Sequence, residues 1–81
     1  MRVYVLTHGE DYEGETTLGV FMSPEHAKLG AFDDNIGLHR TYGEWTPREK
    51  YTGDRYVQRW EQRCVEYDDL FYCLTEWDVV P

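Results

Sequence analysis

The chain has 81 residues, with eight lysines and arginines against sixteen aspartates and glutamates, and a net charge of -8. A chain this short can bury one hydrophobic core, so we expect a single domain over residues 1–81. The negative charge argues against direct binding of nucleic acid through a basic surface.

The N-terminal part predicts two strands. Residues 3–6, Val-Tyr-Val-Leu, form an apolar run typical of a strand covered on both faces, and we expect this strand to be the middle one of its sheet. Residues 8–15 contain two glycines and four acids, which favours a loop. Residues 16–22 are rich in Thr, Val and Phe and predict a strand that returns antiparallel to the first.

A helix is predicted to begin after the second strand. Ser23 can cap the first turn, and Pro24 fits the first helical position. The small residues Ala27, Gly30 and Ala31 would let the helix lie close to the sheet, and the helix should end between residues 33 and 37.

The segment after this helix predicts little regular structure. Residues 46–49, Thr-Pro-Arg-Glu, match a capping box with proline at the first helical position, which indicates a short helical turn. Residues 52–54, Thr-Gly-Asp, indicate a turn that leads into the last third of the chain.

Residues 56–80 predict a hairpin whose turn lies at residues 68–69. Pairing about that turn places Trp60 opposite Trp77 on an apolar face directed to the core, with Cys64 opposite Cys73 on the same face. The other face is expected to be charged and in contact with water. Its first strand carries Arg59, Glu61 and Arg63.

These elements predict an α+β fold, a single antiparallel sheet of about four strands with one helix packed on one face, in the order β-β-α-β-β. An edge strand of such a sheet can pair with its own copy, so the prediction allows a homodimer.

The expected environment is the cytoplasm. The N-terminus lacks the long apolar region of a signal peptide, and no apolar run has the length of a membrane span. Cys64 and Cys73 are therefore expected to be reduced thiols that pack as small apolar groups.

No group of residues assembles into a recognisable chemical site. The histidines and cysteines are too scattered to predict a metal site, and the acidic residues 11–15 lack the full spacing of a calcium loop. Ser23 is explained as a helix cap, and the cysteines are assigned to the core, where thiols are inert. We expect no metal, no cofactor and no enzymatic activity, with a small enzyme of unrecognised site as an alternative.

A basic, aromatic segment over residues 40–55 is the first candidate for function. Trp, Tyr and Arg dominate protein-binding hot spots, so we expect the chain to bind another protein. The alternative is that Trp45 and one tyrosine close the edge of a small core. The predicted contact residues are Tyr42, Trp45, Arg48 and Tyr51.

An acidic surface is the second candidate. Carboxylates that replace phosphates could compete for a DNA site, which would make the protein a polyanion mimic that inhibits a nucleic-acid-binding host defence protein. This requires the first loop and the last turn to lie at one end of the molecule. The residues concerned are Glu10, Asp11, Glu13, Glu15, Glu66, Asp68 and Asp69.

A short N-terminal pattern supports an accessory role. A Val-Tyr-Val strand at residues 3–5 is followed by Gly-Val-Phe at residues 19–21 and by a Ser-initiated helix with an early Ala at residues 23–27. In this pattern the chain resembles small uncharacterised proteins of actinobacteria and their phages. The resemblance implies an accessory protein of a phage or mobile element, and it implies no catalytic residues.

Overall fold

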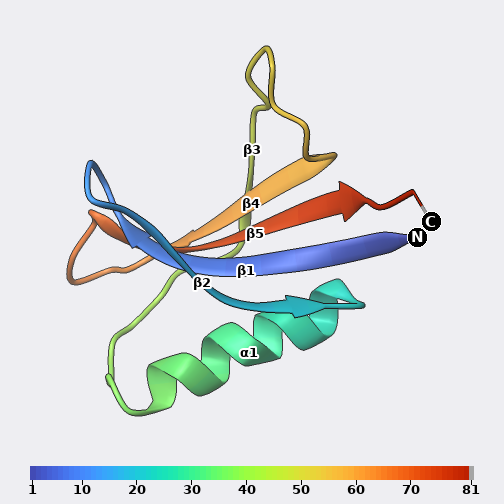
Figure 1. Ribbon diagram of the computed structural model, residues 1–81. Helices are drawn as coiled ribbons and strands as arrows, with labels where there is room; N and C mark the ends of the chain where they lie inside the picture. The colour runs from blue at the N-terminus through green and yellow to red at the C-terminus, as the bar shows by residue number, and fades with distance from the viewer. Residues whose placement is uncertain (81) are drawn as a thin grey trace.

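In the computed structural model, which describes residues 1–80, a five-stranded antiparallel sheet carries one helix on one of its faces (Figure 1). The order across the sheet is β2-β1-β5-β4-β3. The predicted α+β class is confirmed, with one strand more than expected. The elements are β1 (Arg2–Glu10), β2 (Gly14–Phe21), α1 (Pro24–Ile36), β3 (Thr46–Arg48), β4 (Gln58–Arg63) and β5 (Leu70–Asp78).

The last strand, β5, occupies the middle of the sheet. Residues 70–74, Leu-Phe-Tyr-Cys-Leu, are all buried, as expected for a run that is covered on both faces. The prediction that residues 3–6 form the middle strand is wrong, because β1 lies between β5 and the edge strand β2. The apolar run of β5 is the longer of the two, so the middle of the sheet buries more apolar surface with β5 than with β1.

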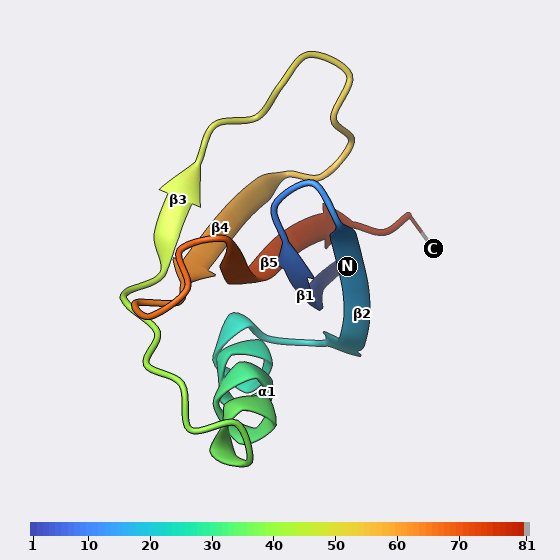
Figure 2. The same ribbon diagram turned by 90° about the vertical axis from the view of Figure 1, so that its left-hand side faces the viewer.

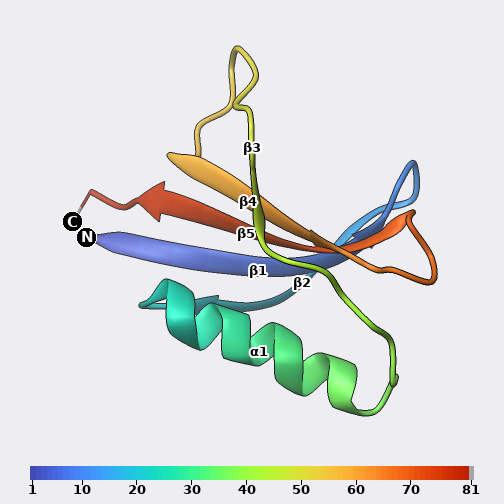
Figure 3. The same ribbon diagram turned by 180° about the vertical axis from the view of Figure 1, so that it is seen from behind.

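Helix α1 begins as predicted and lies against β1, β2 and β5 (Figure 3). The Ser23 hydroxyl accepts a hydrogen bond from the His26 N–H at 3.2 Å, and Ala27 and Ala31 are buried against the sheet. A Cβ atom on Gly30 would lie 2.8 Å from the Phe21 ring, so the close approach depends on glycine. No helix within residues 1–80 combines the length and apolar character that crossing a membrane requires.

The register of the β4–β5 hairpin differs from the prediction. Trp60 pairs with Leu74 instead of Trp77, and Cys73 pairs with Glu61 instead of Cys64. Side chains alternate between the two faces of a strand, so an odd shift exchanges the faces. Trp60 therefore lies on the helix side and Trp77 on the opposite side, and the predicted apolar face that they share is wrong.

The connection between β4 and β5 explains the shift. The tight turn at residues 68–69 is present and is closed by a backbone hydrogen bond of 2.9 Å. Before it, Val65 and Glu66 leave the hairpin and pair with Thr41: the Val65 N–H donates to the Thr41 carbonyl at 2.7 Å, and the Glu66 carboxylate accepts from the Thr41 N–H at 2.8 Å. This contact with a distant segment lengthens the loop and moves the register.

Two further segments differ from the prediction because of tertiary pairing. Residues 8–15 were expected to form a loop, but β1 continues to Glu10 and β2 begins at Gly14, with a short turn between them. Residues 46–49 were expected to be helical, but residues 46–48 form the edge strand β3. Pro47 lacks an N–H group and is tolerated there because an edge strand pairs on one side only.

The face of the sheet opposite α1 carries no helix, and we call it the open face. It is formed by alternate residues of the strands, including Thr7 of β1, Cys73 of β5 and Glu61 of β4. The loop between β3 and β4 rises on this side, as the view turned by 90° shows (Figure 2). The open face is therefore bordered by a projecting loop and has no covering layer.

Burial of the β5 side chains can be tested with two leucines. Leu74 is 0 % exposed and Leu29, on the outer side of α1, is 57 % exposed. Leu74→Ala should lower the free energy of unfolding by about 3 kcal/mol because it leaves a cavity, whereas Leu29→Ala should change it by less than about 0.5 kcal/mol. Urea denaturation followed by tryptophan fluorescence measures both, and equal losses would contradict the assigned burial.

Candidate functional site

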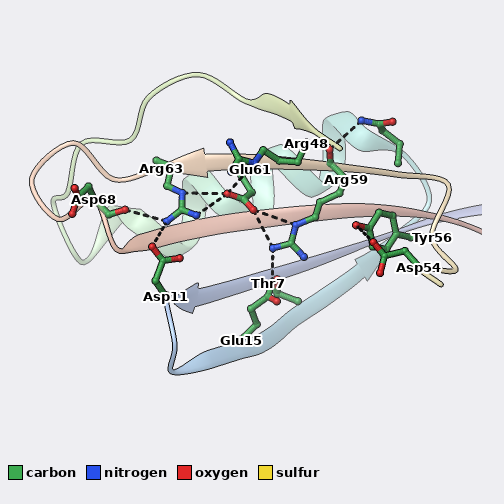
Figure 4. Close-up of polar contacts among 11 residues, drawn as sticks. Thr7, Asp11, Glu15, Arg48, Asp54, Tyr56, Arg59, Glu61, Arg63 and Asp68 are labelled. Atoms are coloured by element: carbon green, nitrogen blue, oxygen red, sulfur yellow. Dashed lines mark hydrogen bonds and ion pairs between the residues drawn. The ribbon is translucent and has the colours of Figure 1, made fainter. Parts of the chain in front are cut away.

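A buried carboxylate lies at the centre of the open face (Figure 4). Glu61 of β4 is 7 % exposed. Its Oε1 accepts hydrogen bonds from Nε and Nη2 of Arg63 at 3.1 and 2.9 Å, and its Oε2 accepts one from Nε of Arg59 at 3.2 Å. Arg48 of β3 forms a longer ion pair, with Nε 3.7 Å from Oε1. Three guanidinium groups thus surround one carboxylate, and we call this group with its partners the Glu61 network.

The inner two arginines link β4 to the β1–β2 hairpin. Arg63 donates from Nη1 to Asp11 Oδ2 at 2.9 Å, and Arg59 Nη2 lies 3.6 Å from Glu15 Oε1. The Thr7 hydroxyl also donates to Glu15 Oε1, at 2.7 Å. These contacts cross β5 and neutralise two of the acids that were expected to keep residues 8–15 in a loop.

An aromatic ring supports the network from the neighbouring strand. Phe71 of β5 lies between Arg63 of β4 and Gly9 of β1 in the register. A Cβ atom on Gly9 would lie 3.0 Å from the Phe71 ring and 2.7 Å from the Gly14 carbonyl oxygen, so this position requires glycine. The Arg63 guanidinium lies 4.7 Å from the ring centre, in the range of a cation–π contact.

Burial sets the charge states around the network. Burial raises the pKa of the Cys73 thiol to about 12, so this thiol is neutral and inert near pH 7. For Arg59 and Arg63, burial alone would lower the pKa, but the surrounding negative groups outweigh it and raise the pKa. Both arginines therefore remain charged.

A cleft of about 550 Å³ opens beside the network, beneath the β3–β4 loop. The Asp54 carboxylate holds this loop by accepting hydrogen bonds from the Tyr51 N–H at 2.8 Å and from the Tyr56 hydroxyl at 2.7 Å. The hydrogen bond from Tyr56, and after it the one from Tyr51, lowers the pKa of Asp54. Burial, and after it the hydrogen bond to Asp54, raises the pKa of Tyr56 to about 12. The cleft is lined by Pro47, Arg48, Glu49, Tyr51, Asp54, Tyr56, Arg59 and Glu61.

The predicted contact residues fall on two sides of the molecule. Arg48 and Tyr51 line the cleft on the open face, and Tyr51 is 77 % exposed. Tyr42 and Trp45 are half-buried and pack against the core on the helix side. The structure therefore brings Arg48 and Tyr51 together, and it places Tyr42 and Trp45 where the alternative interpretation expected them, at the edge of the core.

Tyr42 belongs to a cluster of aromatic side chains beneath the sheet. Its hydroxyl lies 2.9 Å from Nε2 of His8, and its ring centre lies 4.6 Å from that of Tyr72. The Tyr72 hydroxyl donates to Asp34 of α1 at 2.6 Å. Burial lowers the pKa of His8, which favours the neutral imidazole near pH 7. This cluster borders a smaller groove of about 300 Å³ between α1 and the sheet.

The two acidic turns lie at one end of the molecule, as the polyanion hypothesis requires. The Asp11 N–H donates to the Asp69 carbonyl at 2.9 Å, which joins the two turns directly. Asp11 and Glu15 contact arginines, and hydrogen bonds from the Thr41 N–H and other donors lower the pKa of Glu66. Within residues 1–80 the carboxylates without an ion pair in this set are those of Glu10, Glu13, Glu66, Asp68 and Asp69.

Sequence reasoning named Arg48 of the Glu61 network but missed Tyr56, Arg59, Glu61 and Arg63 as site residues. The alternation of Arg59, Glu61 and Arg63 did place them on one charged face of a strand. It could not show that Glu61 is buried, because its burial depends on Arg48 of β3 and on the β1–β2 hairpin. In the part of the chain that the structure describes, no three His, Cys, Asp or Glu side chains are grouped so that they could hold a metal ion.

Comparison with protein families places the chain in a family. The model of the family described as "Domain of unknown function (DUF7336)" matches residues 1–71, so the chain belongs to this family. The matched range contains the Glu61 network and the cleft and ends within β5. Neither the search of curated proteins nor the search of solved structures gives a match.

The structural importance of the network can be tested at its centre. Glu61→Gln removes the negative charge that three guanidinium groups share, and it should lower the free energy of unfolding by about 2 kcal/mol. Glu13→Gln, in the exposed β1–β2 turn, is the matched control and should change it by less than about 0.5 kcal/mol. Urea denaturation at low salt compares the two variants, and an equal effect would show that Glu61 does not organise the arginines.

Proposed function

We propose that this member of the family is a small acidic, non-enzymatic accessory protein that acts by binding another protein through the open face of its sheet. The proposal rests on one observation. An exposed tyrosine, Tyr51, whose backbone N–H donates a hydrogen bond to the Asp54 carboxylate, lines a concave cleft that also presents Arg48 and Tyr56. The N-terminal resemblance to small proteins of actinobacteria and their phages supports an accessory role in a phage or mobile element.

The composition of the cleft supports a protein partner. Tyrosine and arginine remove a large area from water while they keep a polar group for hydrogen bonding, which is why they recur in binding hot spots. Both types line the cleft, and Arg48 keeps 52 % of its side chain exposed although it pairs with Glu61. A partner could therefore contact the guanidinium without breaking the network.

The loop geometry also favours binding. The Asp54 carboxylate is bonded to the Tyr51 backbone and to the Tyr56 hydroxyl, and the Tyr56 ring packs edge-on against Trp77 with centres 6.1 Å apart. A loop that is ordered before binding loses less conformational entropy when the complex forms. The backbone at Tyr51 is thus ordered before a partner binds.

An affinity experiment tests this surface. Tagged protein is used to recover partners from a lysate of the cells that naturally express it, and Tyr51→Ala is compared with Tyr12→Ala, an exposed tyrosine of the β1–β2 turn. Tyr51→Ala should weaken binding of the recovered partner by about tenfold or more, as expected for a hot-spot residue, and Tyr12→Ala should retain it. Equal recovery by both folded variants would refute the cleft as the contact surface.

A second candidate function, the polyanion mimic, is favoured by the direct contact of the two acidic turns. The Asp11–Asp69 hydrogen bond brings the carboxylates of the first and last hairpins to one end of a protein with net charge -8. Such a surface could compete with DNA for a basic host defence protein.

Salt dependence distinguishes the mimic from ordinary protein binding. A mimic should displace DNA from its target, with an affinity that falls steeply as salt rises, and Asp68→Asn with Asp69→Asn should weaken it. Asp33→Asn on the exposed side of α1 is the control and should have little effect. Fluorescence anisotropy of labelled DNA measures this competition. Competition that does not depend on salt, or that is unchanged by the substitutions at residues 68 and 69, would count against the mimic.

A further inference from the structure

The two edges of the sheet differ in how they are protected. The edge strand β3 has three residues, and they include Pro47 and Arg48, which both discourage pairing with another strand. The edge strand β2 has eight residues, and residues 16–22 contain no charge and no proline. Natural sheets usually blunt an exposed edge with such residues. The unprotected β2 edge, opposite β3 in Figure 2, therefore needs a physical explanation.

The C-terminal half of β2 carries a row of apolar side chains. Val20 pairs with Val5 and so lies on the open face. Leu18 lies two residues before Val20 within β2, which directs it to the same face in extended chain, and Met22 follows directly after the strand ends at Phe21. The exposed fraction is 39 % for the Leu18 side chain, 61 % for Val20 and 64 % for Met22. An irregularity in the β1–β2 register at Leu18 bends the strand on the N-terminal side of this row, so the regular part of the edge runs from Leu18 to the end of β2 at Phe21.

We propose that the β2 edge pairs antiparallel with β2 of a second copy of the chain, about a two-fold axis at Val20. In this register Val20 faces Val20 of the second copy, and Leu18 faces its Met22. Every exposed apolar side chain of the row then meets another one, while the outer backbone N–H and C=O groups of β2 gain partners.

Charge supports a second copy as the occupant despite the net charge of -8. No ionised side chain lies within residues 18–22, so the paired ladder places no like charges opposite each other. Glu15 lies beyond the bend and contacts Arg59 and Thr7, and Glu25 lies in the first turn of α1. A pattern that complements itself about a two-fold axis is what an isologous interface requires.

The pairing leaves the cleft accessible. The cleft lies by β3 and β4, at the other side of the sheet from β2. A two-fold axis perpendicular to the sheet joins the two sheets into one and keeps both open faces on the same side. The dimer would thus present two clefts in one direction.

The oligomeric state tests the proposal. Sedimentation velocity over a range of concentrations should show a reversible dimer of the wild-type protein. Val20→Lys places two lysines opposite each other on the axis and should raise the dissociation constant by about tenfold or more. Val65→Lys is the matched control, because Val65 is 67 % exposed in the β4–β5 connection, and it should leave the dimer unchanged. A wild-type monomer at millimolar concentration, or equal dimerisation of both variants, overturns the proposal.

Cysteine cross-linking tests the position of the axis. Cys64 and Cys73 are free and buried, so a cysteine introduced at Val20 is the accessible thiol of the folded chain over residues 1–80. Opposed Cβ atoms in an antiparallel pair lie about 4.5–5.5 Å apart, within about 1 Å of the separation that a disulfide requires, so a small local shift brings the two sulfur atoms into bonding distance. Val20→Cys should form a covalent dimer under mild oxidation much faster than Val65→Cys. Equal rates for the two variants would contradict pairing at Val20.

Discussion

The pairing register between β4 and β5 is the constraint on which the rest of the structure depends. It places Trp60 beneath the sheet with Leu74 and turns Glu61 to the other face beside Cys73. An odd shift would exchange these faces and turn the guanidinium groups of β4 to the helix side, away from Asp11 and Glu15. The register is fixed by Val65 and Glu66, which leave the hairpin to pair with Thr41. A contact outside the hairpin thus decides what each face of the sheet contains.

The Glu61 network follows from that register and organises the charge of the molecule. The arginines of β4 have carboxylate partners on three elements: Glu61 on their own strand, Glu15 on β2 and Asp11 in the turn before it. The positive charge of these arginines is therefore neutralised by carboxylates on the open face. Within residues 1–80 the acids that form no ion pair lie outside this centre, in or next to the turns, in α1 and in the segments around β3. A strongly acidic chain can therefore hold an arginine-rich centre.

Two of the candidate surfaces lie at opposite borders of the sheet. The cleft beneath the β3–β4 loop offers polar and aromatic groups on a loop that Asp54 keeps ordered. The β2 edge offers backbone groups and an apolar row at the opposite border of the sheet. Because the sheet lies between them, pairing at one border does not obstruct the other, and binding of a partner and self-association can occur together.

The sequence by itself determined the local elements. Ser23 and Pro24 specify where α1 begins, and Ala27 and Ala31 mark the side of the helix that is buried. Residues 68–69 specify a tight turn. These features could be predicted because they depend on residues that are close together in the chain. Tertiary structure alone decided the rest. The strand conformation of residues 46–48, the extension of β1 and β2 through an acidic segment, and the burial of Glu61 all depend on partners more than ten residues away. No local pattern encodes such pairings, since their free energy arises only when the distant strands meet.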